Sequence, residues 1–513
     1  MTTPVRLALS CLALAFCFGG CASSDDSLEL PPAADVVPRA GASAMRTDSG
    51  DSQRLPPAVA RADSVDVESY RDTVRAIVSE ALARGQAWDK LVSLCTTAPH
   101  RLAGSPGAAA AVEWAKQAME TDGLDRVWLE ECTVPHWVRG TTERLTIVSP
   151  AQFAGEELSI LALGGSIATA ETGLVAPIVE VKSWEALGDL GGGAAGKIVF
   201  FNRPMDAELI DTGAAYGGAV DQRVHGARRA AAQGGVGAIV RSMTTRLDDY
   251  PHTGGMRYAD DIEKVPTAAV STIGAERLSQ LLAEGHEVVV KLELDCETLP
   301  DEVSYNVLGE IRGSEFPDEV VVIGGHLDGW DVGQGAMDDG GGCCQSIEAL
   351  RLMKTLGLRP RRTVRAVMFM NEENGLRGGR AYYDAHERDM ADHVLAIESD
   401  SGPFTPRGFT TDANPEALAI LQQIVELMAY TGATRVKPGG GGADINPMKA
   451  GGVIVMGYDP DGQRYFDLHH SHADTLDKLS PREVNLGAAC MAAMAYVVAD
   501  LPETLPRNPT PEN

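Results

Sequence analysis

The chain has 513 residues, which at roughly 150 residues per domain is enough for more than one domain. Hydrophobic residues make up 44% and charged residues 23%, a globular composition that excludes wholesale disorder and a collagen-like fibre. The net charge of −28 argues against nucleic acid as a partner, because the phosphate backbone would be repelled. The acidic balance indicates either a well-solvated surface or carboxylates that hold cations.

The first 20 residues have the layout of a secretory signal peptide. Arg6 precedes an apolar stretch that ends in small residues and is short for a membrane span. The sequence FGGC, which ends at Cys21, resembles a bacterial lipobox, in which the cysteine is lipidated and becomes the mature N-terminus. We therefore expect a cell-envelope lipoprotein that faces the periplasm or the exterior and touches the membrane only through the lipid on Cys21. Ordinary secretion is the alternative.

A flexible tether is expected over residues 21–64, which are rich in Ser, Asp, Pro and Ala and lack apolar periodicity. From about residue 65, apolar residues recur at three- and four-residue spacing and predict a helix. This helix opens the first part of a larger domain, residues 65–159. None of the cysteines has zinc-type spacing. Cys95 and Cys132 either pair in an oxidising compartment or stay free.

Residues 160–298 have a different texture. Short β-like runs alternate with Gly-rich turns, which predicts a compact α/β domain inserted into a larger one. Its three histidines stand singly in the sequence, so we expect them to be structural or exposed rather than metal ligands. They are His225, His252 and His286.

The second part of this larger domain is expected over residues 299–513. Near-continuous apolar strands alternate with helices there, which predicts a sheet buried on both faces. The expected fold is therefore α/β, with a mostly parallel central sheet, helices on both faces and the inserted α/β domain. A capping box is predicted at Ser480–Glu483, where the last helix begins. The main expected strands are 319–325, 363–370, 393–398 and 453–457.

Metal-type side chains follow these strands directly. In open α/β sheets the site forms beyond the carboxyl ends of the strands, so these side chains should converge. His, Asp and Glu without Cys suit a hydrolytic dizinc site, where one carboxylate bridges the ions and another stays free as a base. The adjacent Glu372 and Glu373 can divide ligand and base roles between them. The complete set is His326, Asp328, Asp338, Glu372, Glu373, Asp400 and the run His469-His470-Ser471-His472.

This ordered set resembles the dizinc exopeptidases of the aminopeptidase and glutamate carboxypeptidase type. The resemblance covers nearly all of the mature chain, including the protease-associated insert that such enzymes often carry. It implies that one zinc ion is bound by His326, Asp338 and Asp400, and that a second is bound by Asp338, Glu373 and His470. The stretches that carry it are GGHLDGWDVGQGAMDDGGG, FMNEENGLRGG, AIESDSG and YFDLHHSHADT.

The resemblance also implies roles for residues beside the ligands. Glu372 is the implied general base, and Asp328 is expected to hydrogen-bond His326 and fix its tautomer. His470 is preferred over its two neighbouring histidines because the family's ligand lies four residues before the acid of an acid-Thr pair, here Asp474-Thr475.

The implied substrates are dipeptides and short peptides, cleaved in the carboxypeptidase sense. An aminopeptidase with the same site is the first alternative, followed by a single-zinc glutaminyl cyclase-like transferase and a non-catalytic receptor-like protein. A homodimer stays open. The Gly-rich stretch 438–444 is either a substrate-facing loop or a plain turn. A free C-terminal carboxylate would need a cationic partner, and the candidates are Arg377, Arg380, Arg435 and Lys437.

Overall fold

The computed structural model describes residue 61 and residues 65–510. The signal segment, Cys21 and nearly all of the expected tether lie outside these residues. Within the described part, no helix is long and apolar enough to cross a membrane. The six cysteines of this part, Cys95 and Cys132 included, are all free and buried.

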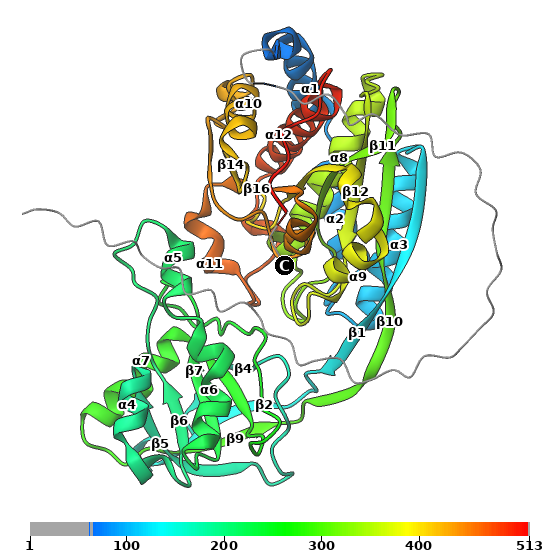
Figure 1. Cartoon of the computed structure of the whole chain (residues 1–513). Coiled ribbons are helices and arrows are strands. Elements are labelled where there is room, and N and C mark those ends of the chain that lie inside the picture. Colours follow the sequence, from blue (N-terminus) through cyan, green and yellow to red (C-terminus); the bar gives the residue numbers. More distant parts are fainter. Residues whose placement is uncertain (1–60, 62–64, 511–513) are drawn as a thin grey trace, which may run out of the picture. The chain divides into compact units, whose positions relative to one another are not determined.

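An eight-stranded sheet forms the centre of the larger part of the chain (Figure 1). Its strand order is β1-β10-β12-β11-β13-β16-β14-β15, and the four strands β12, β11, β13 and β16 run parallel. The expected mostly parallel central sheet is therefore confirmed. The strands are β1 (Arg126–Val138), β10 (Glu297–Ile311), β11 (Phe316–His326), β12 (Arg362–Phe369), β13 (His393–Glu398), β14 (Pro406–Thr411), β15 (Arg435–Pro438) and β16 (Ile454–Pro460).

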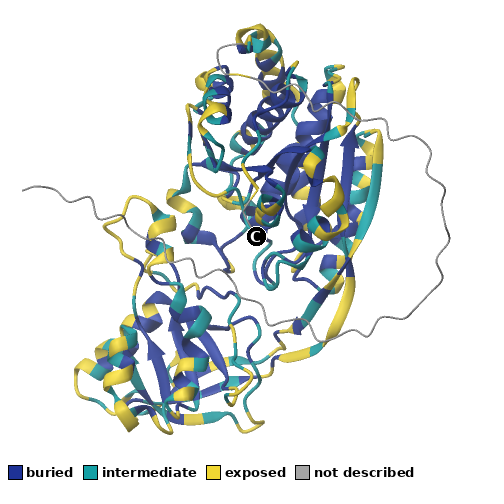
Figure 2. Cartoon of the chain, in the orientation of Figure 1, coloured by how far each residue is buried: buried dark blue, intermediate teal, exposed yellow. Residues whose placement is uncertain are grey.

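Helices cover both faces of this sheet because its central strands are apolar on both sides. Along β11, Val321 and Ile323 join the core beneath α8 and α12, while Val320 and Val322 join the core beneath α9. Figure 2 shows α8, α12 and the central strands as the most buried elements. The helices are α1 (Arg71–Arg84), α2 (Ala87–Thr97), α3 (Pro106–Thr121), α8 (Gly341–Thr355), α9 (Arg377–His386), α10 (Pro415–Glu426), α11 (Tyr465–Leu468) and α12 (Pro481–Asp500).

The start of α12 differs from the expected capping box. Pro481 occupies the first turn as predicted, but no side chain in the described part caps it. The carboxylate of Glu483 instead accepts a hydrogen bond from the hydroxyl of Thr405 and lies 3.6 Å from the Arg464 guanidinium. The side chain of Glu483 therefore contacts Thr405 and Arg464 instead of capping the start of the helix.

A second eight-stranded sheet has the order β3-β2-β9-β5-β6-β7-β8-β4, with β5 to β8 parallel. Four helices accompany it: α4 (Trp184–Asp189), α5 (Thr212–Gly217), α6 (Asp221–Ala232) and α7 (Thr272–Ala283). The strands are β2 (Glu143–Ser149), β3 (Glu157–Leu158), β4 (Ile160–Ala162), β5 (Leu174–Val181), β6 (Ile198–Phe201), β7 (Gly237–Arg241), β8 (Thr267–Val270) and β9 (Val289–Leu294).

The pairing of β2 bears on where the insert begins. Its residues fall within the range 65–159 expected for the first part of the larger domain, yet the strand pairs with β9 in the second sheet. The long strands β1 and β10 pair antiparallel from one sheet toward the other, so the chain enters and leaves the second sheet along one ribbon (Figure 1). We therefore propose that the insert starts near residue 139 rather than at residue 160.

Candidate metal centre

The first group of candidate ligands surrounds the ring of His326, the last residue of β11. Its Nε2 atom lies 3.2 Å from Oδ1 of Asp338 and 3.3 Å from Oδ1 of Asp400. Asp338 belongs to a short irregular helical turn, η4 (Ala336–Gly340), and Asp400 follows β13. Burial lowers the pKa of His326, but these carboxylates outweigh it and hold the pKa well above its usual value.

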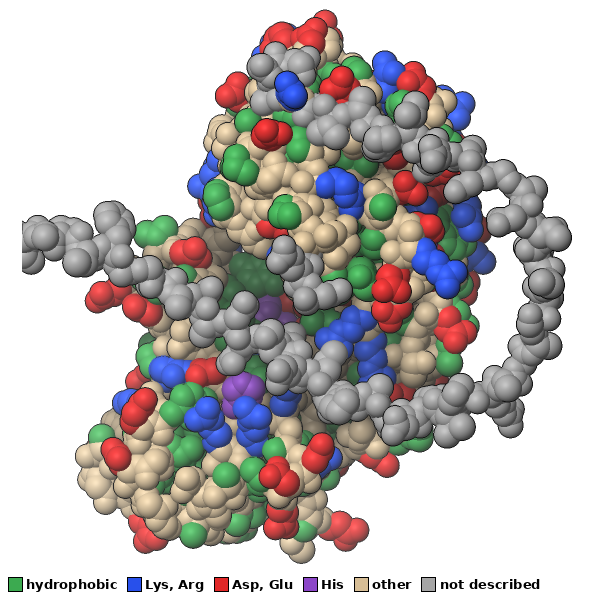
Figure 3. Space-filling view, in the orientation of Figure 1, with side chains coloured by type: hydrophobic (Ala, Val, Ile, Leu, Met, Phe, Trp, Pro, Cys, Tyr) green, Lys and Arg blue, Asp and Glu red, His purple; other side chains and the backbone are tan. Residues whose placement is uncertain are grey.

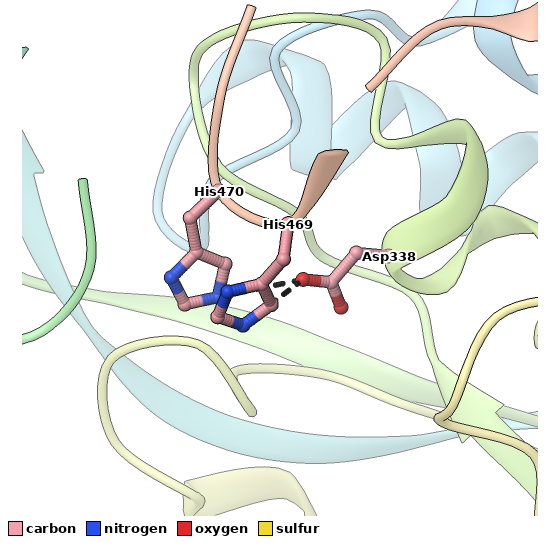
Figure 4. Close-up of side chains that lie close together, drawn as sticks. All are labelled: Asp338, His469 and His470. Atoms are coloured by element: carbon pink, nitrogen blue, oxygen red, sulfur yellow. Dashed lines mark ion pairs between the residues drawn. The ribbon is translucent and has the colours of Figure 1, made fainter. Parts of the chain in front are cut away.

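The second group uses the other oxygen of Asp338. Its Oδ2 lies 3.4 Å from Nε2 of His470 and 3.7 Å from Nε2 of His469 (Figure 4). Nε2 of His470 is also 2.9 Å from Oε2 of Glu373, which follows β12. The two oxygens of one carboxylate thus face two different sets of imidazole nitrogen, the arrangement expected of a bridging ligand.

His469 and His470 are both close enough to count as candidates. Their rings stack at 3.5 Å, and ligand atoms of both residues lie within 4.8 Å of Asp338. His470 is nearer to Asp338 and also contacts Glu373, so it satisfies both expected neighbours. His472 is exposed and lines a different cavity, together with Arg144 and Tyr250.

The site is chemically suited to divalent cations. Among the described residues, only histidines form ion pairs with Asp338, Asp400 and Glu373. Oδ2 of Asp338 and Oε1 of Glu373 are buried without a hydrogen-bond partner in this part of the chain. Burial beside other carboxylates also raises the pKa of Glu373 well above its usual value. Buried carboxylates of this kind are costly unless a cation compensates them.

Glu372 stands at the edge of the same group. Burial raises its pKa to about 8; the nearby His326 opposes this rise, and Asp400 and Asp338 add to it. Its backbone N–H donates to Oδ1 of Asp328 at 3.0 Å, and the N–H of Asn371 donates to the same oxygen at 2.7 Å. The buried Asp328 therefore holds the loop that carries Glu372.

The structure corrects one expectation about Asp328. Nδ1 of His326 lies 3.1 Å from the backbone carbonyl of Asp328, whereas the Asp328 carboxylate is 3.8 Å away. A carbonyl oxygen can only accept, so Nδ1 carries a proton, and Nε2 is the nitrogen that would bind a metal ion once it has lost its own proton. The backbone carbonyl of Asp328 therefore orients the imidazole of His326. The carboxylate of Asp328 instead accepts hydrogen bonds from the N–H groups of Asn371 and Glu372.

Two further residues support the site, and one of them has no signal in the sequence. Arg101 is fully buried and donates to the carbonyls of Leu327, Gln334 and Gly335 at 2.6–2.8 Å, across the loop between His326 and Asp338. Asp474 accepts from the N–H groups of Met337 and Asp338 at 2.7 and 3.2 Å. Only Asp474 stood in a recognisable motif.

A cavity of about 730 Å³ opens beside the metal centre. Asp400 and His469 line it, together with Tyr216 of the insert. In Figure 3 a hollow on the displayed face shows hydrophobic and histidine side chains. Of the four expected cations, Arg435 and Lys437 line the cavity, but both pair with Asp459, at 2.9 and 3.2 Å. Arg377 pairs with Asp301 instead, and neither it nor Arg380 lines the cavity.

An unexpected cation lies against Tyr216, a lining residue of this cavity, without lining the cavity itself. Arg223 of α6 is 8% exposed, and its Nε and Nη1 atoms are buried with no hydrogen-bond partner among the described residues. Its guanidinium carbon lies 5.5 Å from the ring centre of Tyr216, which in turn lies 5.4 Å from the ring of His469. Burial lowers the pKa of His470 to about 3, and the positive charge of Arg223 contributes to this lowering.

Comparisons with known proteins agree with this geometry. Residues 306–495 match the model of peptidase family M28. Carboxypeptidase Q of Mus musculus and that of Homo sapiens are each 38% identical over 446 residues, covering 86% of this chain and 92% of theirs. The crystal structure of a peptidase M28 precursor from Shewanella amazonensis has a TM-score of 0.83 at 35% identity and covers 87% of this chain and 100% of that one. An aminopeptidase from Aneurinibacillus shares the fold, with a TM-score of 0.57 at 18% identity over 86% of this chain and 98% of its own.

The fold and the site together define a metallo-exopeptidase, a hydrolase of peptide bonds. More particularly, the chain belongs to peptidase family M28.

Proposed function

We propose that the chain is a dizinc carboxypeptidase that acts on dipeptides and short peptides. His326, Asp338 and Asp400 would hold one zinc ion, and Asp338, Glu373 and His470 the other. The observation that carries this proposal is the split geometry of Asp338, whose two oxygens face different imidazoles at 3.2 and 3.4 Å. A single-zinc cyclase would use only one of these two sets of candidate ligands and would leave the other set without a metal ion.

Zinc held by these residues would supply a Lewis acid that can polarise the peptide carbonyl and lower the pKa of water. Glu372 then takes the proton of the attacking water and passes it to the leaving amine. Asp328 keeps Glu372 in place through two backbone N–H donors. Arg101 and Asp474 hold the loop that presents Asp338, so the carboxylate is oriented before substrate arrives.

The carboxypeptidase sense is supported by Arg223. A substrate carboxylate gains most from a cation that is not already neutralised, because displacing an existing partner offsets the new pair. Arg435 and Lys437 share Asp459, whereas no carboxylate in the described part pairs with Arg223. Arg223 does not itself line the cavity, but its neighbour Tyr216 does, so the free C-terminus of a short peptide bound beside Tyr216 would give this buried guanidinium an anionic partner. The relatives titled carboxypeptidase Q agree with this sense.

The test uses an N-acetylated tripeptide in two forms, with a free and with an amidated C-terminus. We expect the wild-type enzyme to release the last residue of the free acid and to cleave the amide poorly. In Arg223→Met the preference for the acid should fall by roughly 10–100-fold, because a charge-assisted hydrogen bond is lost. Product analysis by mass spectrometry and kcat/KM for both peptides measure this.

Arg435→Met is the matched control and should keep most of the preference, since Asp459 already pairs with that arginine. The aminopeptidase alternative makes the opposite prediction. If the acetylated peptide survives while an unblocked peptide loses its first residue, the carboxypeptidase sense is wrong and the metal centre stands.

We also propose that the protein is exported and anchored in the cell envelope through lipidated Cys21. Cys21→Ser should move the protein from the membrane fraction to the soluble fraction or leave its signal segment uncleaved, because the lipid attachment atom is lost. Fractionation followed by immunoblotting measures the distribution, and peptidase activity per molecule should be unchanged. Wild-type protein found wholly in the soluble fraction would contradict the anchor.

A further inference from the structure

The loop that carries His470 is bound to the insert by main-chain and side-chain hydrogen bonds. The N–H of Thr253 donates to the carbonyl of His470 at 2.9 Å, and Nδ1 of His470 donates back to the carbonyl of Thr253 at 3.3 Å. Beside them, Nδ1 of His252 donates to the carbonyl of His469 at 2.6 Å. An isolated antiparallel bridge joins His252 to Ser471. Two adjacent residues of the insert, His252 and Thr253, therefore contact three residues of the loop that carries the candidate ligand, His469 to Ser471.

The contacts of His252 continue into the second sheet. The N–H of His252 donates to Oγ of Ser242 at 2.9 Å, and that hydroxyl donates to the carbonyl of Val270 at 2.7 Å. Ser242 directly follows β7, and Val270 ends β8. His252 itself is 1% exposed. The contacts thus run without a gap from the core of the insert to the metal centre.

The ligand loop needs such support because its backbone is strained. His470 has a φ of +60°, in the left-handed region that is unfavourable for a residue with a Cβ atom. A ligating imidazole also needs a fixed acceptor for its second ring nitrogen, which sets the tautomer and the direction of Nε2. Here that acceptor is Thr253, a residue of the insert.

We propose that His252 is a positioning residue of the metal centre, so that the insert helps to set the zinc affinity of the subsite formed by His470 and Glu373. This inference rests on the proposed function for the assignment of His470 as a ligand. Losing the donor on His252 frees the His469 carbonyl and lets the loop relax toward ordinary backbone angles. The subsite of His326 and Asp400 has no contact of this kind with His252 and keeps its affinity.

The experiment compares His252→Leu with His252→Asn in the full chain. Asparagine places an amide N–H near the position of Nδ1, whereas leucine has no donor. Zinc is removed with a chelator, and the affinities of both subsites are measured by chelator competition and calorimetry without substrate. The unfolding midpoint of the zinc-free protein, relative to wild type, establishes that each variant is folded. His286→Leu, elsewhere on the insert, is the matched control.

We expect His252→Leu to weaken one subsite by about 10–100-fold, the usual cost of losing a partner behind a ligand. His252→Asn should restore most of that affinity, and His286→Leu should bind zinc as wild type does. Wild-type affinities in folded His252→Leu would overturn the proposal, and so would equal losses in the leucine and asparagine variants.

If His252→Leu does not fold, Ser242→Ala provides the second variant, because it removes the anchor behind His252 and leaves the imidazole in place. A weakened subsite then supports the proposal, and unchanged affinities overturn it. Wild-type protein that binds two zinc ions without cleaving peptides would contradict the proposed function alone.

Discussion

Replacing Glu372 with glutamine is expected to reduce kcat by roughly 10²–10⁴-fold while zinc content and fold stay unchanged. Glutamine has nearly the same shape and still donates its backbone N–H to Asp328. Its amide oxygen cannot take up the proton of the attacking water at neutral pH. Substrate binding does not need that proton transfer, so KM should change far less than kcat. Steady-state kinetics and elemental analysis of the same preparation measure both quantities.

Glu373→Gln is the matched comparison because it makes the same chemical change one residue along the chain. Its Oε2 atom lies 2.9 Å from Nε2 of His470, so we expect this variant to lose affinity for one zinc ion. The comparison of the two variants therefore distinguishes the role of general base, expected for Glu372, from the role of metal ligand, expected for Glu373. A Glu372→Gln enzyme with near wild-type kcat, or one that loses zinc as Glu373→Gln does, would show that the roles are wrongly assigned.

The convergence of these residues was predictable because most of the candidates follow an apolar strand of one sheet. His326 ends β11, Glu372 and Glu373 follow β12, and Asp400 follows β13. Parallel neighbours end at the same edge, so a single sequence feature, polar residues after apolar runs, located the site. The strands themselves were predictable because a sheet buried on both faces needs near-continuous apolar runs.

The residues that support the site were not predictable in this way. Arg101 and Arg223 reach the centre from other parts of the chain, and His252 stood as a lone histidine in the insert. Their partners are mostly backbone carbonyls and, for Arg223, the ring of Tyr216, and such partners leave no pattern of residue types. Glu483 is the opposite case. The local sequence predicted that its side chain would cap the helix, but that side chain accepts a hydrogen bond from Thr405 instead.

Asp338→Asn should remove the ability to hold two zinc ions at once. An asparagine side chain has one acceptor oxygen and no charge, so it cannot face both imidazole groups with an anionic oxygen as Asp338 does at 3.2 and 3.4 Å. Two divalent cations that share a site repel each other, and the bridging negative charge offsets that repulsion. We therefore expect zinc content to fall from about two ions per chain to one or fewer, with activity reduced by more than about 10²-fold.

Elemental analysis after zinc loading and desalting measures the stoichiometry, and steady-state kinetics measure the activity. Asp339→Asn is the matched control, because Asp339 accepts hydrogen bonds from the N–H groups of His326 and Gly342 rather than facing an imidazole. An amide oxygen can accept one of the two, so this variant should keep most of its zinc. If Asp338→Asn retained two zinc ions, Asp338 would not be the bridge. If wild-type protein bound only one ion, the dizinc proposal would give way to a single-zinc centre built around His326 or His470.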